Sequence, residues 1–108
     1  MDCIFCKIVN KEIPAELVYE DDYTVAFNDL NPQAPIHILV VPKKHYNSMN
    51  EVDEQGFTHI FSAVPKVMKK LCVKEYRTVV NTGESAGQTV FHIHVHVMAG
   101  RKFTWPAG

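Results

Sequence analysis

Cysteine is scarce in this chain of 108 residues, which contains only three, and two of them lie three positions apart. A small and odd number of cysteines does not make a disulfide framework, so we expect a reducing, cytoplasmic environment. The first residues also lack the basic start and the apolar centre of a secretory signal peptide. The cysteines therefore point to a metal site or to ordinary packing, and not to cross-links.

Long apolar runs and a net charge of one sign are absent as well. No apolar stretch approaches the roughly 18 residues that a membrane-spanning helix needs, so we expect no membrane segment. The formal net charge is -1, which gives no electrostatic reason to expect a nucleic-acid or anionic-membrane partner. The sequence contains no repeats or linkers, and its length is that of one domain over residues 1–108.

The hydrophobic pattern predicts an α+β domain, with an antiparallel sheet of about five strands, one main helix and a short N-terminal helix. Short apolar runs predict strands at 17–20, 23–28, 36–41, 76–81 and 92–98, and a helical turn at 3–10. The main helix is expected to begin after Asp53, a suitable N-cap, and to follow an apolar stripe from Phe57 to Leu71. Pro65 lies inside this stripe and is expected to kink the helix or divide it. Cys72, just after the stripe, is expected to be a small buried residue.

Histidine alternates with apolar residues near the C-terminus, from His92 to Met98. In a β-strand, residues two apart share a face and lie about 6.6 Å from each other. We therefore expect His92, His94 and His96 to form a row on one face. Three neighbouring imidazoles cannot all be protonated cheaply, so at least one of their pKa values should be shifted. The apolar residues between them are expected to face a core: Phe91, Ile93, Val95 and Val97.

Such a row is suited to one of two kinds of chemistry. Three neutral imidazoles can hold zinc and leave a position open for water. Alternatively, one imidazole can attack phosphorus while its neighbours handle protons and charge. The loop before the row favours phosphorus, because glycines 83 and 87 permit tight turns that leave backbone N–H groups free for an anion. Neutral donors come from Asn81, Gln88 and Thr89.

The pattern His92-x-His94-x-His96, followed by two apolar residues, resembles the histidine triad superfamily of nucleotide hydrolases and transferases. The segments 88–96, 100–101 and 105–106 resemble its Hint branch, the purine nucleoside phosphoramidases, and so do 29–37 and 41–45. The resemblance covers essentially the whole chain. It implies a HIT-like fold and a homodimer that joins two sheets across a two-fold axis.

The resemblance also implies an activity, the hydrolysis of nucleoside 5′-phosphoramidates of the AMP or GMP type, or of related nucleotidyl adducts. His94 matches the nucleophile, which forms a covalent nucleotidyl-histidine that water then hydrolyses. His96 matches the histidine that contacts the phosphate and the leaving group. His92 and His37 match supporting partners. Hydrolysis of this kind needs no redox cofactor.

The purine nucleotide is the partner that the resemblance implies. Asp29 matches the acid that holds the ribose hydroxyls, a role suited to a carboxylate because it only accepts hydrogen bonds. Trp105 belongs to a tail that, in this branch, reaches the partner's active site and shapes leaving-group preference. Ala107 stands where the branch usually has a second proline, which loosens that tail. The other matching nucleotide contacts, around the purine and the phosphate, are Ile4, Phe5, Leu30, Phe27, Asn81, Gln88, Thr89 and Val90.

Cys3-x-x-Cys6 departs from many eukaryotic sequences of the branch and is similar to the metal motif of some bacterial relatives. There, a structural zinc ion is held by the cysteine pair with histidines at the positions of His45 and His92. Two cysteines and two histidines make a closed zinc site. The alternative is a pair of buried thiols near a helix end. If zinc takes His92, that residue supports the site and does not contact substrate.

Three other functions stay open at this point. One is dinucleoside polyphosphate hydrolysis of the Fhit type, against which the tail with Gly100-Arg101 and Trp105-Pro106 argues. Another is a metallohydrolase that uses the three histidines as an open zinc site. The last is a nucleotide-binding regulatory module with little turnover.

Overall fold

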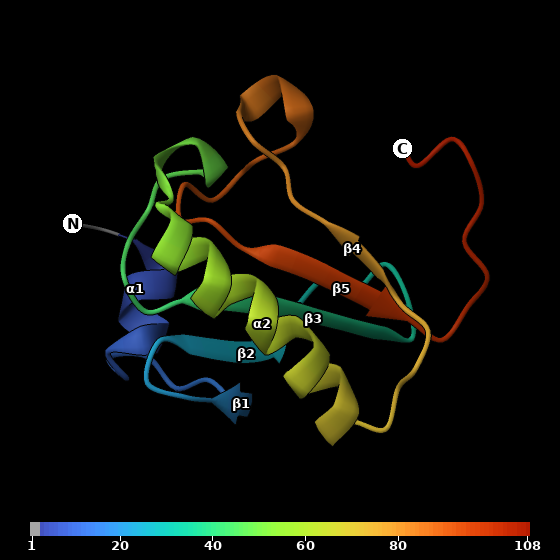
Figure 1. Ribbon diagram of the computed structural model, residues 1–108, viewed down its shortest axis with the longest axis horizontal. Helices are drawn as coiled ribbons and strands as arrows, with labels where there is room; N and C mark the ends of the chain where they lie inside the picture. The colour runs from blue at the N-terminus through green and yellow to red at the C-terminus, as the bar shows by residue number, and fades with distance from the viewer. Residues whose placement is uncertain (1–2) are drawn as a thin grey trace.

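The computed structural model describes residues 3–108 and has the α+β architecture that the sequence predicts (Figure 1). Its antiparallel sheet has five strands in the order β1-β2-β3-β5-β4. The strands are β1 (Leu17–Glu20), β2 (Thr24–Asn28), β3 (Ile36–Pro42), β4 (Arg77–Val79) and β5 (Val95–Ala99). The helices are α1 (Ile4–Val9) and α2 (Glu54–Lys70), and short 3-10 turns lie at Met49–Glu51 and Glu84–Ala86. β3 is the central strand, as its nearly continuous apolar run predicts.

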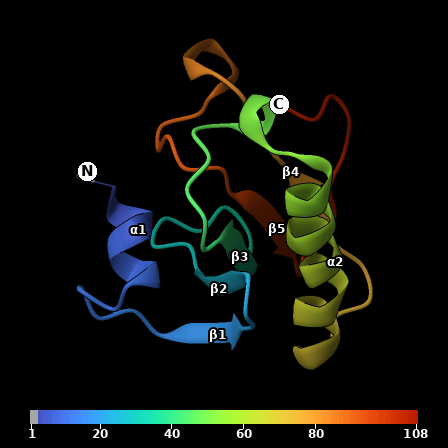
Figure 2. The same ribbon diagram turned by 60° about the vertical axis from the view of Figure 1, so that its left-hand side comes forward.

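The two faces of the sheet are covered by different helices, with α2 on one side and α1 on the other (Figure 2). Side chains alternate along a strand, so β3 serves both faces. Ile38 and Val40 belong to the core under α2, whereas Leu39 and Val41 belong to the core under α1. The same alternation leaves His37 on the α1 face of the sheet.

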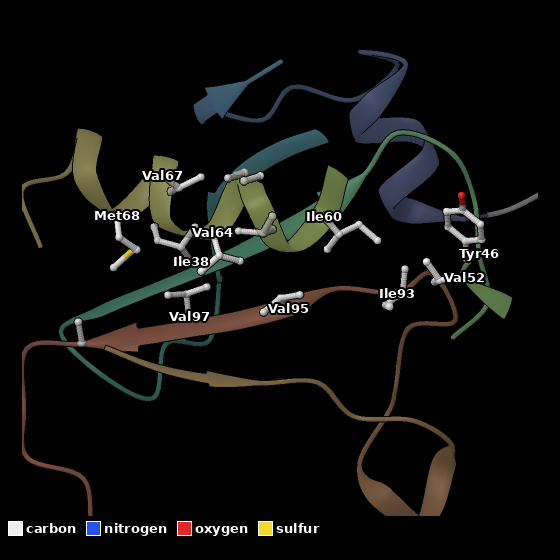
Figure 3. Close-up of a cluster of buried hydrophobic side chains, with 14 residues drawn as sticks. Ile38, Tyr46, Val52, Ile60, Val64, Val67, Met68, Ile93, Val95 and Val97 are labelled. Carbon is white, nitrogen blue, oxygen red and sulfur yellow. The ribbon is translucent and has the colours of Figure 1, made fainter. Parts of the chain in front are cut away.

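The larger core lies between α2 and the sheet (Figure 3). The helix contributes a stripe at three- and four-residue steps that includes Ile60, Val64 and Val67, all nearly inaccessible to solvent. Val95 and Val97 of β5 face this stripe and are fully buried. Full burial of one such side chain stabilises the fold by about 1.5–3 kcal/mol. This core has more buried residues than the core under α1, so it makes the larger hydrophobic contribution.

The smaller core is built where α1 packs on the opposite face. Phe5 of α1 meets Phe27 of β2 edge to face, with ring centroids 5.5 Å apart. α1 has only six residues and spans one end of the sheet. The rest of that face is left for the histidines.

α2 begins at the predicted cap, because the Asp53 carboxylate accepts the N–H of Gly56 at 2.7 Å. The expected division at Pro65 is wrong, since α2 runs without a break from Glu54 to Lys70. Pro65 is exposed, whereas Val64 and Val67 beside it are buried. Packing on both sides of the proline therefore holds the helix together despite the lost backbone bond.

Three further expectations are corrected. The strand predicted at 76–81 contains only Arg77–Val79, and the histidine strand begins at Val95 and not at residue 92. The ladder with β3 ends at Val95, and the segment before it turns away so that the N–H of Ile93 bonds to Tyr46 O. As a result, Phe91 is 49% exposed and not in the core.

Cys72 is exposed and not buried, because α2 ends two residues before it. Its φ of 60° takes the chain out of the helix into the next segment. Within residues 3–108, no helix is both long enough and apolar enough to cross a bilayer.

Gly56 provides a test of how tightly the start of α2 is packed. A Cβ at this position would lie 2.7 Å from Tyr46 Oη and 2.8 Å from Val52 Cγ1. Gly56→Ala is therefore expected to lower the free energy of unfolding by about 1–3 kcal/mol, although alanine is the better helix former. Urea unfolding measures this change. Gln55→Ala, one position earlier on the exposed side, is the control, and a more stable Gly56→Ala protein would contradict the packing described.

Candidate active site and metal cluster

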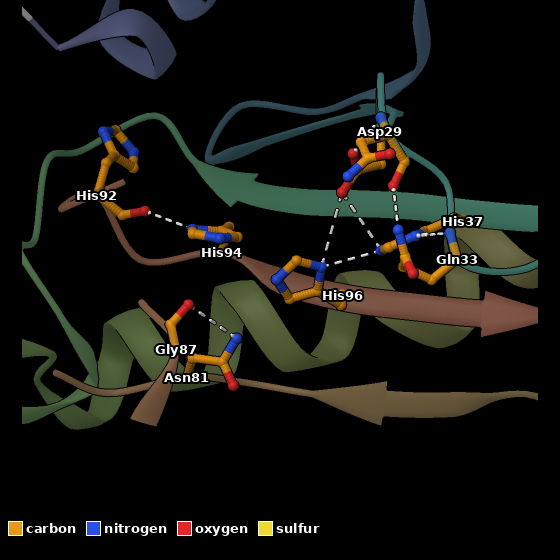
Figure 4. A network of polar contacts seen from close by, with 9 residues as sticks. Asp29, Gln33, His37, Asn81, Gly87, His92, His94 and His96 are labelled. Atoms are coloured by element: carbon orange, nitrogen blue, oxygen red, sulfur yellow. Dashed lines mark hydrogen bonds and ion pairs between the residues drawn. The ribbon is translucent and has the colours of Figure 1, made fainter. Parts of the chain in front are cut away.

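The candidate site lies on the α1 face of the sheet, where β3 and β5 run side by side. The register pairs His96 with Leu39 and His37 with Met98. His37 and His96 are therefore diagonal neighbours on the same face, and Nε2 of one lies 2.9 Å from Nδ1 of the other (Figure 4). His94 precedes β5, and its ring meets the His96 ring with centroids 4.9 Å apart.

His94 is held by the backbone of the residue two positions before it. Its Nδ1 lies 2.9 Å from His92 O, and because a carbonyl only accepts, Nδ1 must carry the proton. Nε2 of His94 therefore has a free lone pair. Burial is the main cause that lowers the pKa of His94, so the ring is neutral and nucleophilic at pH 7.

The proton positions of His37 and His96 follow from a backbone donor. The N–H of Gln33 points at Nδ1 of His37 at 3.0 Å, so that nitrogen is an acceptor and Nε2 carries the proton. His37 Nε2–H then donates to Nδ1 of His96, which leaves the proton of His96 on Nε2. Burial, with smaller contributions from His94 and His37, lowers the pKa of His96 to about 4. His96 thus presents an N–H donor in a neutral ring.

Asp29 faces the same pair of histidines from the end of β2. Its Oδ2 lies 3.4 Å from His37 Nε2 and 3.8 Å from His96 Nδ1. Its Oδ1 accepts the N–H of Asn31 at 2.8 Å, which fixes the carboxylate in the loop. The carboxylate remains partly exposed and can accept hydrogen bonds from a ligand.

A second cluster joins the predicted metal ligands Cys3, Cys6, His45 and His92, which lie in three distant parts of the chain. Sγ of Cys3 is 3.3 Å from His92 Nδ1, and Sγ of Cys6 is 3.3 Å from His45 Nδ1. Nδ1 of His45 and Nδ1 of His92 are 3.1 Å apart. Donor atoms that bind one zinc ion at 2.0–2.3 Å in a tetrahedron lie roughly 3.3–3.8 Å apart, so the spacing fits such an ion.

The proton positions in this cluster also fit a metal ion. His92 Nε2 donates to Pro42 O at 2.8 Å, and His45 Nε2 donates to Asn47 Oδ1 at 2.9 Å. Both Nδ1 atoms therefore direct bare lone pairs at each other. Ligating histidines typically donate their second N–H to a carbonyl or carboxylate in this way. Burial lowers the pKa of His92 to about 4, so Nδ1 of His92 carries no proton at pH 7. The four residues can hold a metal ion.

The remaining three-membered group, Asp29, His37 and His96, also has its polar atoms close together. The Gln33 N–H places the proton of His37 on Nε2, the atom that would have to bind a metal. This group is therefore a proton network. The open zinc site of three histidines is not formed either, since His92 turns to the cysteines while His94 and His96 make other bonds.

The loop before the histidines is shaped by Gln88, which is 2% exposed. Its amide donates to Asn47 O at 2.6 Å and to Val90 O at 3.1 Å, and its Oε1 accepts the N–H of Gly83. Both amide hydrogens of Gln88 thus form hydrogen bonds within the protein, and these bonds hold the loop in place. Nδ2 of Asn81 lies 3.5 Å from Gly87 O. Asn81 and the exposed Thr89 both keep polar groups at the surface.

The predicted purine contacts are placed at different depths. Phe5 is buried, and its ring meets the His94 ring edge to face at 5.1 Å. Phe27 is also buried, whereas Ile4 is 49% exposed and Leu30 is 98% exposed. A cavity of about 460 Å³ beside the metal cluster includes Ile4 in its wall. It is also lined by Thr89 and Val90.

Trp105, the predicted tail residue, is 83% exposed. Two groups that sequence reasoning missed are the N–H of Gln33 and the carbonyl of Pro42, which set the proton positions of His37 and His92. Both are backbone groups, so no residue type marks them in the sequence.

Comparison with known proteins agrees with this geometry. The HIT domain model of protein families matches residues 10–103. An uncharacterized HIT-like protein of Synechocystis is 44% identical over 99% of this chain and 97% of its own length. Protein HitA of Neisseria gonorrhoeae is 43% identical over 90% of this chain and 94% of its own.

Solved structures match equally well. A HIT family hydrolase from Legionella pneumophila superposes with a TM-score of 0.92 at 42% identity, covering 99% of this chain and 100% of that one. A histidine triad protein from Clostridium difficile gives a TM-score of 0.89 at 49% identity, covering 96% and 95%. Since the family model spans most of its length and these relatives share both its sequence and its fold, the chain belongs to the HIT family of histidine triad proteins.

Proposed function

We propose that this protein hydrolyses nucleoside 5′-phosphoramidates of the AMP or GMP type, or related nucleotidyl adducts, with His94 as nucleophile. The observation that carries the proposal is the bond from His94 Nδ1 to His92 O, which leaves Nε2 with a free lone pair in a buried, neutral ring. An imidazole in this state attacks without first losing a proton. Covalent catalysis then divides one difficult displacement into two easier steps.

In the first step, His94 Nε2 forms a bond to the α-phosphorus and the P–N bond to the leaving group breaks. The leaving nitrogen takes the bonding electron pair, accepts a hydrogen bond from Nε2–H of the neutral His96 ring, and takes a proton from solvent. In the second step, water attacks the phosphorus and releases a proton to solvent, and the bond to His94 breaks. The products are a nucleoside monophosphate and an amine.

Charge on the phosphoryl oxygens requires fixed donors nearby. His96 Nε2–H, the side chains of Asn81 and Thr89, and backbone N–H groups of the loop before the histidines are the donors that we assign to it. The Asp29 carboxylate would accept hydrogen bonds from the ribose hydroxyls. Phe5 with its apolar neighbours would contact the purine. Trp105 would act on the leaving group.

Zinc is the metal that we propose for Cys3, Cys6, His45 and His92, because two thiolates and two imidazoles are the ligand set of a closed structural site. When bound, this ion supplies no reacting group and orders its ligands. His92 has two separate duties as a consequence. Its imidazole is used by the metal cluster and its carbonyl holds His94.

The first prediction concerns the covalent intermediate. With a fluorogenic adenosine phosphoramidate, the wild-type protein is expected to turn over, and His94→Ala is expected to lose roughly 10³- to 10⁴-fold or more in kcat. Intact-mass measurement after rapid acid quenching should show a nucleotidyl adduct on the wild type alone. His59→Ala removes a histidine outside the site and is the control.

Equal turnover by wild type and His94→Ala would disprove the nucleophile. Substrate binding without turnover in the wild type would favour a regulatory module, and preference for a dinucleoside polyphosphate would favour the Fhit type.

The second prediction concerns the metal. The protein as purified is expected to contain about one zinc ion per chain by elemental analysis. Cys3→Ser is expected to lower that content sharply and to reduce the melting temperature. Cys72→Ser is the matched control, because this third cysteine is exposed and lies outside the cluster. Equal metal content in the two variants would exclude the site.

A homodimer is the third prediction. β4 is an edge strand of the sheet in the described chain, and joining two sheets across a two-fold axis would pair two such edges. Sedimentation equilibrium is expected to give twice the mass of 12.3 kDa. A monomer at micromolar concentration would contradict this.

A further inference from the structure

The C-terminal tail is fastened to the loop 29–35 that joins β2 to β3. Nε of Arg101 donates to Gln33 O at 3.1 Å. Gly100, just before it, packs so closely on Pro35 that a Cβ there would lie 2.9 Å from Pro35 Cβ. Its φ of 95° is one that glycine adopts without strain. The start of the tail and the loop therefore pack as one unit.

Arg101 is ordered by more than this one exposed bond. Its guanidinium lies over the Phe103 ring, 4.1 Å from the centroid. Arg77 lies over the same ring at 5.1 Å, and its Nη1 donates to Thr104 O at 3.2 Å. A planar guanidinium that stacks on an aromatic ring loses little further freedom when it donates a hydrogen bond.

Gln33 connects this tail to the histidines through its other backbone group. Its N–H donates to His37 Nδ1 at 3.0 Å, and His37 Nε2 donates to His96 Nδ1 at 2.9 Å (Figure 4). A continuous series of three hydrogen bonds thus joins Arg101 to His96. If the Gln33 N–H moved away, Nδ1 of His37 could take up the proton, and Nε2 would no longer donate to His96.

We propose that Arg101 is a positioning residue for the reaction: by holding Gln33 O, it keeps the Gln33 N–H on His37 and so keeps His96 in the form that carries its proton on Nε2. Arg101 does this without contacting the histidines. The inference rests on the proposed role of His96, because its Nε2–H group is the hydrogen-bond donor assigned to the leaving group.

The test measures proton positions directly. Long-range ¹H–¹⁵N correlation spectra of the imidazole rings distinguish the two neutral forms of a histidine, with or without turnover. In wild-type protein at neutral pH, His37 and His96 are expected to carry the proton on Nε2. In Arg101→Met, which removes the donor, the His37 signals should move toward a mixture of the two forms. kcat should fall roughly three- to tenfold, as expected for the loss of one hydrogen bond, with KM for the nucleotide unchanged.

Arg77→Met is the matched control. Arg77 also packs on Phe103, yet its recorded hydrogen bond is to Thr104 and not to Gln33. This variant removes the other guanidinium from the Phe103 ring and is expected to keep the wild-type ring signals of His37 and His96. Arg101→Lys keeps a cationic donor but cannot stack as a planar group, so it should fall between wild type and Arg101→Met.

Wild-type ring signals for His37 and His96 in Arg101→Met would overturn the proposal, as would equal changes in Arg77→Met. If Arg101→Met does not fold, wild-type signals in Arg101→Lys overturn it instead. If the ring signals change and turnover does not, Arg101 positions these protons as proposed, and the role of His96 in the proposed function fails.

Discussion

The site depends on backbone groups that decide which nitrogen of each buried imidazole carries the proton. The carbonyls of Pro42 and His92 each accept a hydrogen bond from a histidine N–H, and the N–H of Gln33 donates one to His37. In each ring, the nitrogen that does not make this backbone bond is left to make a different contact. A side chain could be exchanged without moving the strand, whereas these backbone groups move only with the strand or loop that contains them.

The sheet provides the rigidity that such bonds require. Because α2 packs against one face, the apolar side chains of β3 and β5 that point to it fix both strands in register. The opposite face then presents His37 and His96 at a constant separation. α1 seals one end of that face with Phe5, which contributes to the burial that keeps the rings of His92 and His94 neutral. Hydrophobic packing on one side of a single layer thus sets the electrostatics of the other.

Much of this arrangement could be predicted from residue patterns. A nearly continuous apolar run located β3, and two-residue alternation placed the buried Val95 and Val97 on the face opposite to His96. Helical spacing located α2 with its cap at Asp53. The grouping of Cys3 and Cys6 with two distant histidines followed from the resemblance and agrees with the geometry. These features depend on side-chain type, which the sequence states directly.

The features that could not be predicted depend on where backbone ladders end. Alternation continues from His92 to Met98, yet β5 begins only at Val95, where its ladder with β3 stops, and the N–H of Ile93 bonds to Tyr46 O instead. The exposure of Phe91 follows from that same departure. The N–H of Gln33 and the carbonyl of Pro42 belong to residues whose side chains take no part in the site. The predicted division of the helix at Pro65 fails for another reason. Tertiary packing keeps α2 helical across a residue that cannot donate the usual backbone hydrogen bond.

The metal cluster has a consequence for the order in which the protein is made. Two of its ligands are residues 3 and 6 and a third is residue 45, so all three leave the ribosome well before His92. The nascent chain can therefore offer only an incomplete set of these four residues until residue 92 has been added. The last ligand and the carbonyl that orients His94 arrive in the same residue. Neither the complete cluster nor the bond that holds His94 can therefore form before residues 92 to 94 have been added.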